Sequence, residues 1–311
     1  MKKIVSLLAA AAMAVSVAFA QDINEVTDMF NYGNEALSMG DKESAMEYLQ
    51  NALTAAEGLG EAGSAIAENC KAVLPHLMIS IAKDYSNSDR FDEAIALLAK
   101  AEEAATLYGD TSRAAEAKAV ANQALMAKAN DLVKSKDYAN AIAVYNQIMA
   151  GNPTNAMAAL RLGQCYSATG NTAKAEEAFL IAAENGQEKQ ANKLLSNIFV
   201  KESQNAYKAK KFQEAIDFAV KSNGFLENAN AYKLAGQAAV GLGKNAEALP
   251  FLEKYVELAP NAKDAVQMRY NIAATAQKLG DKAKAKAYYE QVLSDPKFGP
   301  SAKQQLDALN K

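Results

Sequence analysis

The 311-residue sequence contains no Trp, only one His, two Cys and six Pro. So few Cys exclude a disulfide-stapled scaffold, and 16 Gly with six Pro exclude a collagen-like or low-complexity chain. Half of the residues are apolar, and 67 of them are Ala. Because Ala has the highest helix propensity and Gly and Pro the lowest, this composition favours helix over sheet.

The sequence offers almost no constellation for catalysis. His76 is the only His, so a multi-His zinc site is excluded and no Ser/His/Asp triad can be assembled without it. The string Gly58-x-Gly60-x-x-Gly63 matches a dinucleotide fingerprint. A helical stretch precedes it where that fingerprint needs a strand, so we interpret it as a connection between helices. We therefore expect no enzyme activity, no cofactor and no metal.

Residues 1–20 have the features of an export signal peptide. A basic start precedes an apolar run from Ile4 to Val17, and a small-x-small cleavage pattern ends at Ala20. We expect cleavage after Ala20, a mature chain that begins at Gln21, and a periplasmic location. No later stretch approaches the 18 apolar residues that would cross a membrane, so no transmembrane segment is predicted.

One pattern recurs along the rest of the chain, most clearly in Ala159 to Glu184 and in Tyr232 to Pro260. Each copy has a small residue, an apolar residue three positions later, a distant Ala, and an apolar residue four positions beyond that Ala. Aligning the copies on the Ala gives seven positions: Ala45, Ala94, Ala141, Ala175, Ala215, Ala248 and Ala285. Twelve positions upstream stand seven small residues: Gly33, Ala82, Ala129, Gly163, Ser203, Gly236 and Ala273. Chance would produce this agreement in roughly three cases in ten thousand.

The pattern resembles the tetratricopeptide repeat, although the Trp that opens many such repeats is absent. The resemblance implies an all-α, right-handed αα-superhelix (a solenoid) of about seven helix pairs, in which small residues let two helices approach closely. We predict a solenoid over residues 21–298 and a capping helix over 299–311, with repeats around 26–59, 75–108, 122–155, 156–189, 196–228, 229–262 and 266–298. Cys70 and Cys165 fall in separate repeats, so we expect two packed free thiols.

The repeats are unevenly spaced, and the first two intervals are longer than usual. Because residues 61–74 and 111–121 are rich in Ala and Glu, we predict longer helices there, with Pro75 kinking or dividing the first of them. Residues 300–309 are expected to close the solenoid as a helix whose polar side chains face water: Lys303, Gln304 and Gln305.

The resemblance also implies a protein or peptide partner, bound as an extended segment in a groove lined by the first helix of each pair. One candidate row follows the small positions and is rich in amides, which both donate to and accept from a peptide backbone: Asn34, Lys83, Asn130, Gln164, Gln204 and Gln237. A second row stands four residues before the first and is mostly apolar: Phe30, Ile79, Met126, Leu160, Val200, Lys233 and Tyr270. Packing between neighbouring helices explains the apolar row equally well, so both interpretations stay open.

Some members of the family hold a terminal carboxylate with a set of Lys, Asn and Arg side chains. Here Lys233 is followed by Gln237, and no consecutive repeats supply the full set. We therefore predict no clamp for a terminal carboxylate.

Charge is divided along the chain. Residues 21–190 carry 13 Lys and Arg against 24 Asp and Glu, a net charge of −11, whereas residues 191–311 carry 18 against 12, a net charge of +6. This balance argues against a nucleic-acid partner. Besides a binding scaffold, it suggests a structural envelope protein that self-assembles into a homo-oligomer through its acidic and basic parts. The third interpretation is solvated surface charge with no such role.

Overall fold

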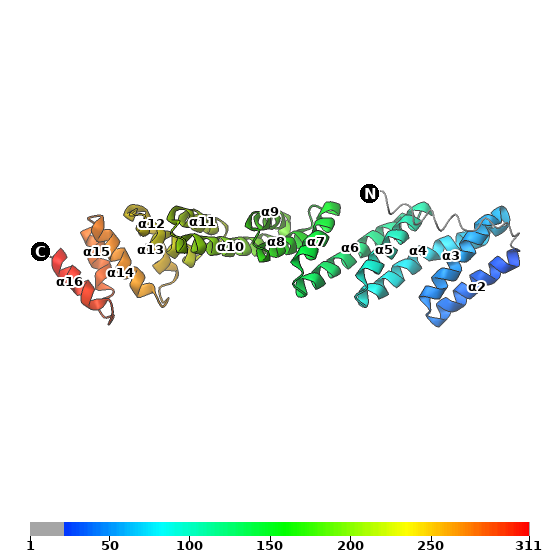
Figure 1. The fold of residues 1–311 in the computed structure, drawn as a ribbon, viewed down its shortest axis with the longest axis horizontal. Helices are drawn as coiled ribbons and strands as arrows, with labels where there is room; N and C mark the ends of the chain where they lie inside the picture. Colours follow the sequence, from blue (N-terminus) through cyan, green and yellow to red (C-terminus); the bar gives the residue numbers. More distant parts are fainter. Residues whose placement is uncertain (1–21, 311) are drawn as a thin grey trace. The chain divides into compact units, whose positions relative to one another are not determined.

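A computed structural model describes residues 22–310, so the predicted signal peptide lies outside the described residues. The described chain consists of helices joined by short connections and contains no strand (Figure 1). The helices are α2 (Ile23–Met39), α3 (Lys42–Gly58), α4 (Ser64–Asn87), α5 (Phe91–Leu107), α6 (Thr111–Lys134), α7 (Tyr138–Gly151), α8 (Ala156–Ala168), α9 (Thr172–Ala182), α10 (Glu188–Lys208), α11 (Phe212–Phe225), α12 (Ala229–Gly241), α13 (Asn245–Leu258), α14 (Ala265–Lys278), α15 (Lys282–Glu290) and α16 (Gly299–Leu309). The predicted all-α fold is confirmed for the described residues.

The chain divides into two compact units after Ser135. We call residues 22–135, with α2 to α6, the N-terminal unit, and residues 136–310, with α7 to α16, the C-terminal unit. Within each unit, consecutive helices pack side by side in antiparallel order (Figure 1). The first helices of successive pairs also contact one another, as α2, α4 and α6 do in the N-terminal unit and α10 and α12 in the C-terminal unit.

Helices of a pair lie close together at the small residues of the repeat. All seven aligned Ala residues are fully buried. A Cβ atom built on Gly33 would lie 2.8 Å from Leu49 Cγ, and one on Gly163 would lie 2.7 Å from the Phe179 ring. In both cases the bulky partner is the apolar residue four positions after the aligned Ala. The predicted close approach at small residues is therefore confirmed at these two positions, where a bulky side chain of the second helix lies directly against the glycine.

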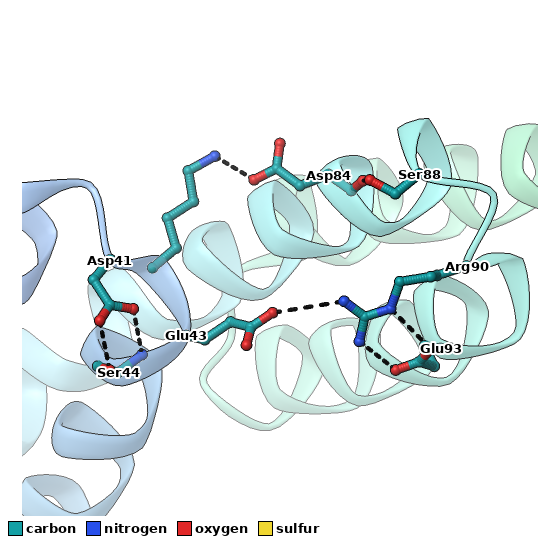
Figure 2. Close-up of polar contacts among 8 residues, drawn as sticks. Asp41, Glu43, Ser44, Asp84, Ser88, Arg90 and Glu93 are labelled. Atoms are coloured by element: carbon teal, nitrogen blue, oxygen red, sulfur yellow. Dashed lines mark hydrogen bonds and ion pairs between the residues drawn. The ribbon is translucent and has the colours of Figure 1, made fainter.

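Short capped turns separate the two helices of a pair. Gly40 adopts a left-handed conformation with φ of 82°, which costs Gly little because it has no Cβ atom. Asp41 then caps α3, with its carboxylate accepting hydrogen bonds from the Ser44 backbone N–H at 3.1 Å and from its hydroxyl at 2.7 Å (Figure 2). These two hydrogen bonds lower the pKa of Asp41.

The long intervals between the first repeats are occupied by long helices, as predicted. Helices α4 and α6 each span 24 residues, and a 3-10 turn over Gly60–Gly63 leads into α4. Of the two outcomes predicted for Pro75, division of the helix is wrong, because α4 runs unbroken from Ser64 to Asn87 with Pro75 buried inside it, and a kink stays a prediction. Leu74, Leu77 and other neighbours of Pro75 lie in the hydrophobic core, and their burial offsets the backbone hydrogen bond that a proline removes.

The closing helix α16 covers the last helix pair. Lys303 and Gln304 are exposed, as predicted. The prediction that Gln305 faces water is wrong: Gln305 is half-buried, and its Oε1 accepts a hydrogen bond from Gln277 Nε2 at 3.0 Å. Gln277 Oε1 in turn accepts one from the Tyr289 hydroxyl at 2.8 Å, so the amide of Gln305 completes a polar chain between helices.

Candidate functional site

The structure distributes the predicted apolar row between core and surface. Ile79 and Leu160 are fully buried in the hydrophobic core. The other members are half-buried: Phe30, Met126, Val200, Lys233 and Tyr270. Ile79 and Leu160 therefore pack between helices and offer no surface to a partner, whereas the half-buried members present part of each side chain to solvent.

The predicted amide row keeps more of its surface. Asn34, Lys83 and Gln204 are exposed, while Asn130, Gln164 and Gln237 are half-buried. Two members contact the first helix of the next pair: Lys83 pairs with Glu116 at 3.0 Å, and Gln237 Nε2 lies 3.8 Å from Met268 Sδ. These two side chains contribute to packing between repeats, and Gln164 and Gln204 do not share that role.

Lys233 belongs to a polar cluster between α12, α13 and α14. Its ammonium lies 3.0 Å from an Asp264 carboxylate oxygen and 5.3 Å from the centre of the Tyr255 ring. The Tyr255 hydroxyl donates to the other oxygen of Asp264. Burial and this hydrogen bond raise the pKa of Tyr255 to about 12. Burial tends to raise the pKa of Asp264, but the hydrogen bonds from Tyr255 and Lys233 outweigh it and lower that pKa. The ammonium of Lys233 is thus paired within the protein.

A concave surface of the C-terminal unit lies between α8 and α10. A hollow of about 330 Å³ is lined by the polar side chains of Gln164, Ser167, Asn197 and Lys201 and by an apolar floor of Ala168, Leu194 and Ile198, next to the fully buried Phe179. The hollow forms because α8 packs mainly on α7 and α9, and α10 mainly on α11 and α9. Gln164 Oε1 accepts a hydrogen bond from Arg161 at 3.1 Å, which leaves its amide N–H groups available in the hollow.

A second hollow of about 550 Å³ adjoins the first along α10, and the two share Leu194. It is lined by Gly186, Gln187, Lys189, Gln190, Lys193 and Leu194. A kink over Ala183–Gln187 precedes α10, where the backbone of Asn185 and Gly186 is not helical, and Gly186 has a φ of 98° that other residues rarely adopt. We call the residues that line these two hollows the α10 groove.

The opposite face of α10 is firmly held. Phe199 is buried and stacks against Phe218 and Phe225, with ring centres 6.2 and 5.8 Å apart. The buried hydroxyls of Ser196 and Ser222 lie 2.9 Å apart in a hydrogen bond between α10 and α11. Since these contacts fix the helix from behind, the groove face is presented by a rigid element, which reduces the entropy lost on binding.

Sequence reasoning located Gln164 but missed most of the groove. Asn197, Lys193 and Lys201 lie outside both predicted rows, since the rows were built from the repeat pattern alone. The signal was present in two places. The interval between Ala175 and Ala215 is longer than the usual repeat, and Asn185-Gly186 marks a turn where the extra residues begin.

A third hollow, of about 350 Å³, lies where the first two helix pairs meet. Its charged side chains are already paired. Lys42 lies 2.6 Å from an Asp84 oxygen, and Glu43 reaches Arg90 at 4.0 Å while Arg90 also binds Glu93 (Figure 2). Because these groups neutralise one another, this hollow offers few free charges to a ligand, and the α10 groove is the better candidate site.

Other sources of chemistry are sparse in residues 22–310. No group of three or more His, Cys, Asp or Glu residues in this range is placed to hold a metal ion. Cys70 and Cys165 are buried free thiols, and burial raises the pKa of Cys70 to about 11, so it stays protonated near neutral pH. His76 is exposed. None of the described helices combines the length and the apolar character needed to cross a membrane.

Comparison with family profiles identifies one repeat family. Tetratricopeptide repeat profiles match residues 29–58, 132–198, 200–263 and 266–294, together more than half of the chain. Among solved structures, that of MamA is 16% identical, covers 58% of this chain and 96% of its own, and has a TM-score of 0.34. The structure of YrrB, described as a tetratricopeptide repeat protein with an unusual peptide-binding site, is 19% identical, covers 58% of this chain and 91% of its own, and has a TM-score of 0.34. The structure of a tetratricopeptide repeat protein from Parabacteroides merdae is 15% identical, covers 92% of this chain and 99% of its own, and has a TM-score of 0.29. No curated protein matches the sequence.

Proposed function

Because this chain belongs to the tetratricopeptide repeat family, we propose that it is a non-enzymatic scaffold that binds an extended segment of a partner protein in the α10 groove. The signal peptide predicted over residues 1–20 supports the further proposal that it acts in the periplasm after cleavage behind Ala20. The observation that carries the binding proposal is the groove itself, where available amide donors stand beside an apolar floor.

Two kinds of contact would hold such a segment. The side-chain amides of Gln164 and Asn197 can each donate to and accept from a peptide backbone, independently of its sequence. Leu194 and Ile198 would take apolar side chains from the segment. The groove follows α10 from Lys189 to Lys201, a rise of about 18 Å, which matches about five or six residues of an extended chain.

Site-specific photo-crosslinking in intact cells tests the proposal. A photoreactive residue at position 197 should capture a partner protein, whereas one at the exposed Gln267 on α14 should not. Gln164→Ala combined with Ser167→Ala should reduce capture from position 197, because both side chains line the groove. Gln237→Ala is the matched control, since Gln237 lies outside the groove and contacts Met268. Equal capture from positions 197 and 267, or capture that ignores the groove variants, would contradict the proposal.

A second candidate function is self-assembly, and the division of charge favours it. Residues 22–135 carry 19 acidic and 9 basic side chains, a net charge of −10, whereas residues 136–311 carry 17 and 22, a net charge of +5. The acidic unit of one molecule would then attract the basic unit of another, and such heterologous contacts extend into rings or filaments.

Sedimentation velocity at two ionic strengths tests self-assembly. If the charged units drive it, the mass of the mature chain should exceed that of a monomer at about 50 mM salt and fall towards a monomer at about 500 mM, where screening is strong. A monomer at both salt concentrations would remove this candidate and leave the groove proposal intact.

A further inference from the structure

We propose that the α10 groove selects extended segments in which acidic side chains alternate with apolar ones. This inference rests on the proposed function and adds the chemistry of the partner. Its basis is a row of polar side chains at every fourth residue of α10: Lys189, Lys193, Asn197 and Lys201. All four line the groove.

The spacing of this row matches an extended chain. Residues four apart on an α-helix form one ridge and are separated by about 6 Å along the axis. Alternate side chains of an extended segment point the same way and stand about 6.8 Å apart. A segment that follows the ridge therefore brings every second side chain to a member of the row, with acidic residues at positions one, three and seven meeting Lys189, Lys193 and Lys201.

The charges of the row are available. Within residues 22–310, none of the three lysines forms an ion pair or a side-chain hydrogen bond, and the facing helix α8 has Arg161 as its only charged residue. A carboxylate that enters the groove therefore meets cations and amides and no competing acid from α8. The even-numbered side chains point away from the row and so meet the α8 side of the groove, where Ala168 is apolar, while Leu194 and Ile198 add apolar surface beside the row on α10.

Fluorescence anisotropy with a labelled peptide, acetyl-DADLNLD-amide, tests the inference on the mature chain. Two unlabelled peptides separate charge from order: NANLNLN lacks the carboxylates, and ALDDDNL has the same composition without the alternation. We expect DADLNLD to bind, and both comparison peptides to compete less well by at least about fivefold, since each exposed ion pair contributes only a fraction of a kcal/mol.

Matched triple variants test the lysines. The groove variant combines Lys189→Ala, Lys193→Ala and Lys201→Ala. Its affinity for DADLNLD should fall by about tenfold, as the loss of three modest ion pairs predicts. The control variant removes the same charge at exposed lysines outside the groove, with Lys263→Ala, Lys278→Ala and Lys303→Ala. Its affinity for DADLNLD should stay within about twofold of the wild-type value, because those charges lie away from the site. Circular dichroism melting verifies that both variants are folded. Equal weakening by the two triple variants, or equal competition by NANLNLN, would overturn the inference.

The same variants separate this inference from the proposed function. If crosslinking from position 197 still captures a partner when the three groove lysines are Ala, the groove binds a segment but does not select acidic residues. If position 197 captures nothing and DADLNLD does not bind, both the inference and the proposed function are wrong. Capture that is lost with the lysines, together with binding of DADLNLD, supports both.

Discussion

The N-terminal and C-terminal units use one packing rule and differ in almost everything else. In both, a small residue on the first helix meets a bulky one on the second, as Gly33 meets Leu49 and Gly163 meets Phe179. Yet residues 22–135 carry a net charge of −10 and residues 136–311 a net charge of +5. The positions that stack the repeats are thus independent of the positions that set the surface, so one repeat pattern can present opposite charges.

The cores of the two units also differ in continuity. In the N-terminal unit, one hydrophobic cluster extends from Val26 to Ala124, and the 24-residue helices α4 and α6 contribute much of it. The buried side chains of the C-terminal unit fall into separate clusters, such as those around Phe199 and around Tyr289. The α10 groove borders the Phe199 cluster, which suggests that a binding surface forms where stacking is less continuous.

The largest expected effect would test the continuous core of the N-terminal unit. A Cβ atom on Gly63 would lie 2.1 Å from the Ala56 carbonyl oxygen, a backbone atom that cannot move aside easily. We expect Gly63→Ala to lower the free energy of unfolding by about 3 kcal/mol or more, as severe overpacking does. Gly58→Ala is the matched control, because no atom lies within 4 Å of a Cβ there, and it should be neutral or slightly stabilising.

The matching change in the C-terminal unit is Gly163→Ala. Its Cβ atom would lie 2.7 Å from the Phe179 ring, a side chain that can shift, so we expect a smaller loss of about 1–3 kcal/mol. Hydrogen exchange measured by mass spectrometry should show each variant loosening its own unit first. If Gly63→Ala and Gly163→Ala accelerated exchange equally throughout residues 22–310, the two units would unfold as one and the comparison would fail.

The stacking of the helices could be predicted from the sequence, because it depends on local size at fixed spacing. Ala45, Ala215 and the other aligned alanines had to be small for two helices to approach, and all are buried. The turn at Gly40-Asp41 was equally predictable, since the Gly conformation and the Asp cap are local properties. The unbroken helix around Pro75 could not be predicted, because the burial of its neighbours outweighs the tendency of a proline to break a helix.

The candidate site could be predicted only in part, because a groove depends on what neighbouring helices leave uncovered. Gln164 was found from the repeat pattern, but Ile79 from the same pattern is in the core. The role of Lys233 depends on Asp264, which lies 31 residues away in sequence and in the next repeat. The lysines of α10 follow a spacing of four that the repeat alignment does not contain.

A smaller effect compares the polar contacts between repeats, starting with the C-terminal unit. Asp264→Asn keeps the shape of the side chain but removes the charge that binds Lys233 and Tyr255. We expect a loss of about 1 kcal/mol in the free energy of unfolding at neutral pH, typical of a partly buried hydrogen-bonded charge. Urea denaturation at several pH values measures it, with Asp264→Glu as the control that retains the carboxylate.

The pH dependence of that loss has a definite sign. Because the folded protein lowers the pKa of Asp264 below 3.8, its ionised form is stabilised by folding. This stabilisation is complete above 3.8 and is lost as the pH falls through the lower pKa of the folded state. The difference between wild type and Asp264→Asn should therefore be constant from neutral pH down to about 5 and shrink below 3.8. A difference that grows on acidification would refute this account of the cluster.

The smallest expected effect is the same substitution in the N-terminal unit, Asp84→Asn. The Asp84 side chain is 55% exposed in its pair with Lys42, whereas Asp264 is 34% exposed and also bonded to Tyr255. Water already solvates Asp84 in the folded protein, so losing its charge should cost less than about 0.5 kcal/mol. Urea denaturation in low and high salt checks this, because the small contribution of an exposed pair should vanish when salt screens it. If Asp84→Asn cost as much as Asp264→Asn, the polar cluster of Figure 2 would stabilise the first two repeats as strongly as core packing does. The distinction drawn between paired surface charge in one unit and half-buried charge in the other would then be wrong.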